Sequence, residues 1–116
     1  MDIKVKQLGR VMLVSLDGEL DLAAAPRVRA AVDEAIEADA KINCLVWDLA
    51  QVDFIDSSGL GVLLGRYNKM KSRDGQVVVA SAPGPLRRML AMAGLERIIR
   101  LVNSNEQALS EIGGGF

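Results

Sequence analysis

Residues 53–67 read Asp-Phe-Ile-Asp-Ser-Ser-Gly-Leu-Gly-Val-Leu-Leu-Gly-Arg-Tyr, an acidic and hydroxyl-bearing segment that runs into an apolar pattern of helical spacing. Aspartate and serine are preferred residues at the start of a helix, where the first backbone N–H groups have no partner and the macrodipole is positive. We therefore expect Asp56 to be the N-cap of a helix and Ser57 and Ser58 to lie in its first turn. One cap needs one side chain, so a hydroxyl is left over at a position where a phosphoryl group is tolerated.

The body of this helix shows an apolar stripe at i, i+3, i+4 and i+7, interleaved with basic residues that we expect to face water. The stripe consists of Leu60, Leu63, Leu64, Tyr67 and Met70, and the basic residues are Arg66, Lys69 and Lys71. The helix should end near residues 74–75. Glycine costs about 1 kcal/mol per helix position relative to alanine, so Gly59, Gly61 and Gly65 need a reason. One interpretation is that the helix packs closely on its neighbours, and the other is that its bare backbone lets a partner approach. Gly59 and Gly61 favour the second interpretation because they are nearest the serines.

Two apolar segments flank this helix. Residues 42–49 and 76–81 are rich in strand-forming side chains, and a strand, helix, strand order predicts two parallel strands with a right-handed crossover. Ser57 and Ser58 should then lie just beyond the carboxyl end of a strand, where open α/β folds usually keep their working site.

The remaining segments complete an α/β fold with a mixed, mainly parallel sheet of four to five strands and about four helices. Residues 3–8 and 10–16 read as a hairpin that turns at Gly9, and Gly18 is expected to end its second strand. The other expected features are a helix starting at Pro26, a helix over 86–93 capped by Gly94, an edge strand over 97–102, a capping box at 104–107 before a last helix, and a fraying tail at 113–116.

Composition limits the function classes. The chain has 116 residues, half of them hydrophobic, which suits one domain over residues 1–116. No apolar run reaches the roughly 18 residues of a membrane span and no signal peptide is recognisable, so we expect no membrane partner and a cytoplasmic location. The single cysteine excludes an internal disulfide, and the lack of histidine leaves no conventional zinc or iron site, so we expect no metal.

Charge divides the chain, because residues 1–58 carry 11 acidic and 6 basic side chains whereas residues 59–116 carry 4 and 8. One end of the molecule is therefore expected to be acidic and another basic. Nucleic acid is not an expected partner, since the net charge is −1 and only 3% of the residues are aromatic.

Enzymatic sites find little support. A Ser-His-Asp triad needs a histidine, and serine–lysine chemistry would need one of only five lysines to be buried beside the hydroxyl. The third glycine of a dinucleotide fingerprint would fall on Leu64, and no P-loop is present. Asp21, Asp53 and Asp56 would be suitable magnesium ligands, but we prefer Asp56 as a simple helix cap. A nucleotide-binding or nucleotide-hydrolysing protein that uses the glycine turn and these carboxylates remains the alternative.

Four segments together resemble the anti-sigma factor antagonists of the STAS superfamily, above all those that act on sigma-F in sporulation. They are residues 18–21, 53–67, 92–100 and 106–109. The resemblance spans nearly the whole chain, and the second segment is highly specific at its length. It implies a single STAS domain whose second serine in the Asp-Ser-Ser-Gly run, Ser58, is phosphorylated.

The resemblance also implies a partner-switching regulator of transcription with no catalysis and no cofactor of its own. Unphosphorylated, such a protein binds an anti-sigma factor that is also a serine kinase, and thereby frees a sigma factor. Phosphorylation of Ser58 breaks the complex, and a PP2C-type serine phosphatase restores it. The expected partner-binding residues are Asp21, Asp56, Ser57, Ser58, Gly59 and Leu60. A stressosome-type STAS module is a further alternative.

Overall fold

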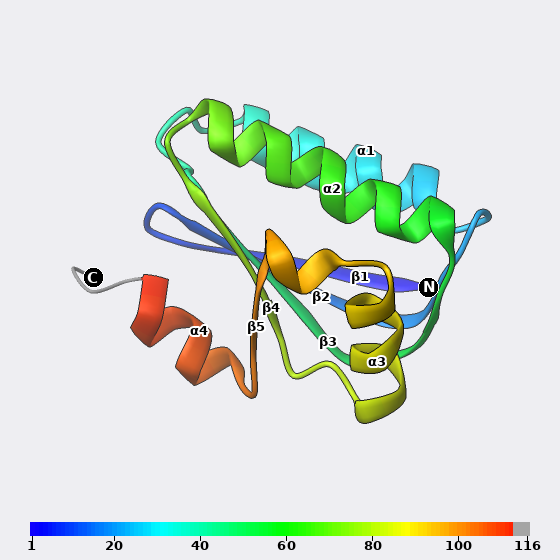
Figure 1. Cartoon of the computed structure of the whole chain (residues 1–116). Coiled ribbons are helices and arrows are strands. Elements are labelled where there is room, and N and C mark those ends of the chain that lie inside the picture. Colours follow the sequence, from blue (N-terminus) through cyan, green and yellow to red (C-terminus); the bar gives the residue numbers. More distant parts are fainter. Residues whose placement is uncertain (113–116) are drawn as a thin grey trace.

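The computed structural model describes residues 1–112 and shows a sheet covered by helices on both faces (Figure 1). The elements are β1 (Asp2–Leu8), β2 (Val11–Leu20), α1 (Ala25–Glu37), β3 (Cys44–Ile55), α2 (Ser57–Ser72), β4 (Gln76–Ala80), α3 (Gly84–Met92), the 3-10 helix η1 (Leu95–Arg97), β5 (Arg100–Val102) and α4 (Asn105–Ile112).

The sheet has five strands in the order β1-β2-β3-β4-β5. The β1 and β2 strands pair antiparallel, and the three other neighbouring pairs are parallel. This arrangement confirms the expected α/β fold with a mixed, mainly parallel sheet, and residues 1–112 contain four α-helices. The hairpin turn at Gly9, where φ is +63°, is also confirmed.

Two hydrophobic clusters lie on opposite faces of the sheet. The larger one joins the sheet to α1, α2 and α3, and Val32, Leu63 and Leu86 are fully buried in it. The smaller one lies under α4 and includes Val46 and Ala108. In Figure 1, α1 and α2 run side by side on one face and α4 lies on the other. No helix in the described part is long and apolar enough to cross a membrane.

Two strands are longer than predicted. The β2 strand does not end at Gly18, because that glycine adopts φ +125° next to a register shift and the strand continues to Leu20. This extension pairs with the far half of β3, which runs to Ile55 and not only to residue 49. Tertiary pairing therefore extends β3 beyond residue 49, and Asp56 follows directly on the end of this strand.

The outer and inner faces of α2 also differ from the prediction. Leu64 is exposed, whereas Arg66 is buried and its Nε lies 3.1 Å from Asp33 Oδ1 on α1. Burial lowers the pKa of Arg66, and the carboxylate of Asp33 opposes that shift. Lys69 contacts Asp33 and Glu37 at 3.2 and 3.1 Å, so a charged cluster joins α2 to α1.

The C-terminal segment follows the predicted signals in part. Residues 95–97 form a 3-10 helix, so the edge strand is shorter than the expected 97–102. Gly94 is left-handed after α3, as its capping role requires. Ser104 Oγ accepts a hydrogen bond from Gln107 N at 3.0 Å, which confirms the hydroxyl half of the capping box, while Gln107 reaches back to Asn103 N at 2.9 Å. The expected fraying of 113–116 lies outside the described residues.

Candidate functional site

Asp56 organises the surface at the start of α2. It is the N-cap, with an extended backbone, and its Oδ1 accepts a hydrogen bond from Gly59 N at 3.0 Å. Its second oxygen, Oδ2, accepts one from Leu22 N, also at 3.0 Å. A single carboxylate thus confirms the predicted cap and, in addition, ties the loop between β2 and α1 to the start of α2.

The two serine hydroxyls are left free by this cap. Neither side chain has a hydrogen-bond partner among residues 1–112. Ser57 is exposed and Ser58 is half-buried, and both follow directly on the carboxyl end of β3, as predicted. Their backbone N–H groups are at the first two positions of the helix, where no intrahelical acceptor exists. Two hydroxyls and the positive end of a 16-residue helix therefore share one small area.

Asp21 lies in the loop that Asp56 holds. Its Oδ1 accepts a hydrogen bond from Ala24 N at 3.0 Å, and its carbonyl accepts one from Ala25 N at 2.9 Å, so it shapes the entry to α1. The neighbouring Leu22 is 72% exposed, and its backbone N–H donates to Asp56 Oδ2, so this loop presents an apolar side chain at the surface. Sequence reasoning missed Leu22. The available signal was an apolar residue between Asp21 and the start of the helix.

The glycines of α2 have different surroundings. A Cβ on Gly59 would lie 2.2 Å from the carbonyl oxygen of Leu20 and 2.7 Å from Cγ1 of Ile55, so this glycine is required by close packing. Our interpretation of Gly59 as bare surface for a partner is revised accordingly, because its backbone is buried. Gly61 is exposed, and a Cβ added there would have no neighbour within 4 Å, so Gly61 provides the exposed backbone near the serines. Leu60, between the two glycines, is half-buried.

The alternative sites lose their geometric basis. Gly59, Gly61 and Gly65 all lie within α2, so the glycine turn on which a nucleotide site depended is absent from this segment. Among residues 1–112 no three acidic or cysteine side chains are grouped so that they could hold a metal ion. Asp53 instead lines a groove of about 370 Å³ between the ends of β2 and β3 and the start of α3.

Removing the side chain of Asp56 should cost both stability and loop order. We expect Asp56→Ala to lower the free energy of unfolding by about 1 to 2 kcal/mol, because the amides of Gly59 and Leu22 lose their acceptor. Urea unfolding measures this change, and amide hydrogen exchange at Leu22 measures the release of the loop. Asp53→Ala, on an exposed carboxylate outside the cap, is the matched control. Equal stability of the two variants would contradict the proposed role of Asp56.

Comparison with known proteins identifies the family of the chain. Residues 2–108, nearly the whole chain, match the STAS domain. The chain belongs to the STAS domain family. This STAS domain is 36% identical to the anti-sigma F factor antagonist of Paenibacillus polymyxa over 114 residues, which cover 97% of the chain and 95% of the relative.

Solved structures show the same fold. The STAS domain aligns with an anti-sigma factor antagonist from Mycobacterium paratuberculosis at a TM-score of 0.84 and 30% identity, covering 96% of this chain and 92% of that one. It aligns with the anti-sigma factor antagonist SpoIIAA in its unphosphorylated form at a TM-score of 0.85 and 25% identity, covering 99% of each chain. The resemblance inferred from four sequence segments is thus confirmed at the level of the family.

Proposed function

We propose that this STAS domain is an anti-sigma factor antagonist whose binding is switched by phosphorylation of Ser58. Unphosphorylated, it binds an anti-sigma factor that is also a serine kinase, and the sigma factor held by that kinase is released. The observation that carries the proposal is the pair of serines at the start of α2 whose hydroxyls take no part in capping the helix, close to the loop with the exposed Leu22. The naming of its relatives as anti-sigma F factor antagonists supports the same function.

The fold can accept a phosphate at this position. Phosphoserine carries about −1.5 to −2 charges near pH 7, and a helix N-terminus stabilises such a charge by its dipole and its free N–H groups. Because Asp56 already caps the helix through Gly59, neither serine hydroxyl is needed to hold the backbone. Phosphorylation therefore leaves the helix intact.

The same charge works against a bound partner. Ser58 lies two residues from Asp56, whose carboxylate binds the loop that carries Asp21 and Leu22, so the phosphate adds negative charge next to this acidic loop. Any acidic group that the partner presents there is repelled, and burial of the phosphate carries a large desolvation cost. The switch acts through the binding surface and not through unfolding.

The proposal specifies a cycle with three kinds of protein. The partner is an anti-sigma factor with serine kinase activity, and a PP2C-type phosphatase removes the phosphate. The chain itself is substrate and regulator, located in the cytoplasm. Sigma-F is the sigma factor to test first, since the relatives from Paenibacillus polymyxa and Lysinibacillus sphaericus are both named anti-sigma F factor antagonists. Other relatives are named anti-sigma-B factor antagonists, so sigma-B is the second.

Peptide mass spectrometry tests the modification directly. The full chain is incubated with the anti-sigma kinase from its own organism and Mg-ATP, and we expect a single phosphate, located on Ser58. Ser58→Ala should remain unmodified under the same conditions. Phosphate on Ser57 would move the site by one residue. An unmodified chain that still bound the kinase would overturn the switch and leave a constitutive antagonist.

A further inference from the structure

The sheet ends at β5, at the opposite edge from β1, and no strand among residues 1–112 pairs with the outer side of β5, which we call the open edge. Val102 accepts a hydrogen bond from Ser81 N at 3.0 Å, and Val102 pairs with Ala80 in a parallel ladder. In such a ladder the backbone N–H and C=O groups of successive residues point alternately toward and away from the neighbouring strand. Those of Leu101 are therefore directed away from β4. No turn, loop or cap bond satisfies them within residues 1–112.

The open edge is bordered by two adjoining grooves. One has a volume of about 560 Å³ and lies between α3, η1 and β5. The other, of about 260 Å³, lies between α2, β4 and α4. Ile98 and Arg100 line both, so together the grooves follow β5 along its length. Ile98 is 47% exposed there and offers an apolar contact beside the free backbone of Leu101.

Arginine side chains dominate the larger groove. Arg87, Arg97 and Arg100 line it, against Glu96 as its acidic residue. Arg100 is paired with Glu111, and Arg87 donates to Asn103 Oδ1 at 3.1 Å. Arg97 is exposed, and within the described residues its side chain has neither an ion pair nor a hydrogen bond. Arg97 therefore leaves an unpaired positive charge at this edge among the described residues.

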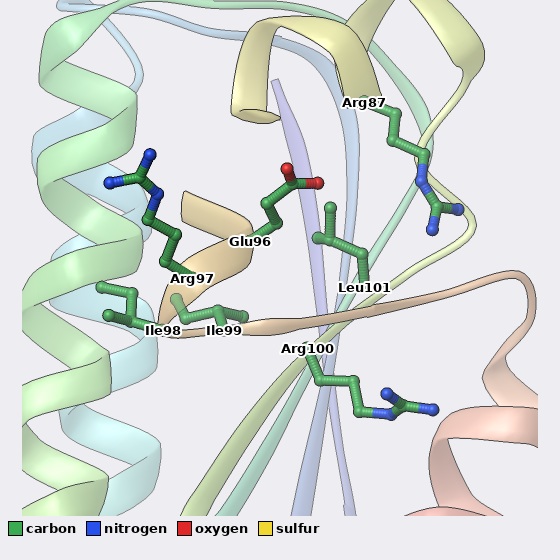
Figure 2. Close-up of a pocket in the computed structure, with 7 residues that line it drawn as sticks. All are labelled: Arg87, Glu96, Arg97, Ile98, Ile99, Arg100 and Leu101. Carbon is green, nitrogen blue, oxygen red and sulfur yellow. The ribbon is translucent and has the colours of Figure 1, made fainter. Parts of the chain in front are cut away.

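The directions of these arginines distinguish between possible ligands. Figure 2 shows Arg97 turned toward α2, Arg100 turned toward α4 and Arg87 reaching from α3 on the far side of the groove. The three guanidinium groups spread along the edge and do not converge on one point, which a compact phosphate would require. The positive charge also repels the same edge of a second copy. An extended acidic chain fits both the spread of charge and the free backbone.

We propose that the open edge of β5 binds an extended acidic segment of another protein, which adds to the sheet as a strand. The backbone of the segment pairs with Leu101, its carboxylates face Arg97 and Arg87, and an apolar side chain covers Ile98. Main-chain bonds provide affinity and the side-chain contacts provide selectivity, as in other cases of strand addition. This site is formed by η1, β5 and α3 and does not use the serines, so it is independent of the function proposed above.

The test uses the ¹⁵N-labelled full chain and an acetylated, amidated hexapeptide of alternating glutamate and valine. Titration should shift the amide signal of Leu101 and slow its hydrogen exchange. Arg97→Glu should weaken binding by about tenfold or more, since it replaces attraction by repulsion at a free side chain. The control is Arg10→Glu, an identical charge change at an exposed residue of the β1–β2 turn, and it should alter affinity by less than about twofold.

Four outcomes would overturn the proposal. The first is a shift of amide signals across the basic surface that leaves Leu101 unchanged, and the second is an equal loss of peptide affinity in the Arg97→Glu and Arg10→Glu variants. The third is the same set of amide shifts with inorganic phosphate alone, and the fourth is a shift at Leu101 that depends on protein concentration without any peptide. The first two indicate unspecific attraction, the third a compact anion site and the fourth a contact between copies of the chain. A peptide in which lysine replaces glutamate should not bind, and binding by it would contradict the role of charge.

Discussion

Ser58→Asp should lose its complex with the anti-sigma kinase, with an affinity at least about 100-fold lower than that of the unmodified protein. The new carboxylate lies two residues from Asp56, whose side chain binds the loop that carries Asp21 and the exposed Leu22, at the surface proposed to bind the partner. A like-charge contact in a desolvated interface costs several kcal/mol. The helix itself tolerates the change, because its N-terminus favours a negative side chain.

Isothermal titration calorimetry of the purified proteins measures this loss. Ser58→Ala should bind within about threefold of the unmodified chain, because the hydroxyl has no bond to lose. Ser110→Asp is the matched control, since it adds the same charge to an exposed serine on α4, across the sheet from α2. A Ser58→Asp protein that bound as tightly as Ser110→Asp would count against the proposed switch.

Of the three glycines of α2, Gly59 should be the one whose replacement by alanine destabilises the protein most. The added Cβ would lie 2.2 Å from the carbonyl oxygen of Leu20 and 2.9 Å from Leu20 Cγ, and the first of these atoms belongs to the backbone of a central strand. Neither the strand nor the helix can move away without breaking the bonds at Asp56. We expect the free energy of unfolding to fall by about 3 kcal/mol or more.

Gly61→Ala provides the opposite result on the same helix. Nothing lies within 4 Å of its added Cβ, so only the gain in helix propensity remains, about 1 kcal/mol of added stability. Urea unfolding of both variants, followed by circular dichroism, measures the difference. If Gly59→Ala were as stable as Gly61→Ala, the close approach of α2 to the end of β2 would be wrong.

The local chemistry of the sequence determined several caps and turns, above all the start of α2 at which the serines lie. Asp56 followed by a helical apolar pattern predicted the start of α2 correctly, and Pro26, Gly9, Gly94 and Ser104 marked caps and turns that the structure contains. These signals are reliable because each depends on a backbone group and a side chain only a few residues apart. The mainly parallel sheet followed from the order of strands and helices.

Only the tertiary structure decided the features that depend on residues far apart in the chain. Extended pairing of β2 with β3 carried the strands past Gly18 and residue 49, and Asp33 on α1 allowed Arg66 to be buried on the face predicted to be wet. The second bond of Asp56, to Leu22, and the open edge at β5 arise in the same way. A periodic pattern shows which side chains one element can bury, but the neighbouring element decides which of them are buried and which remain available for binding.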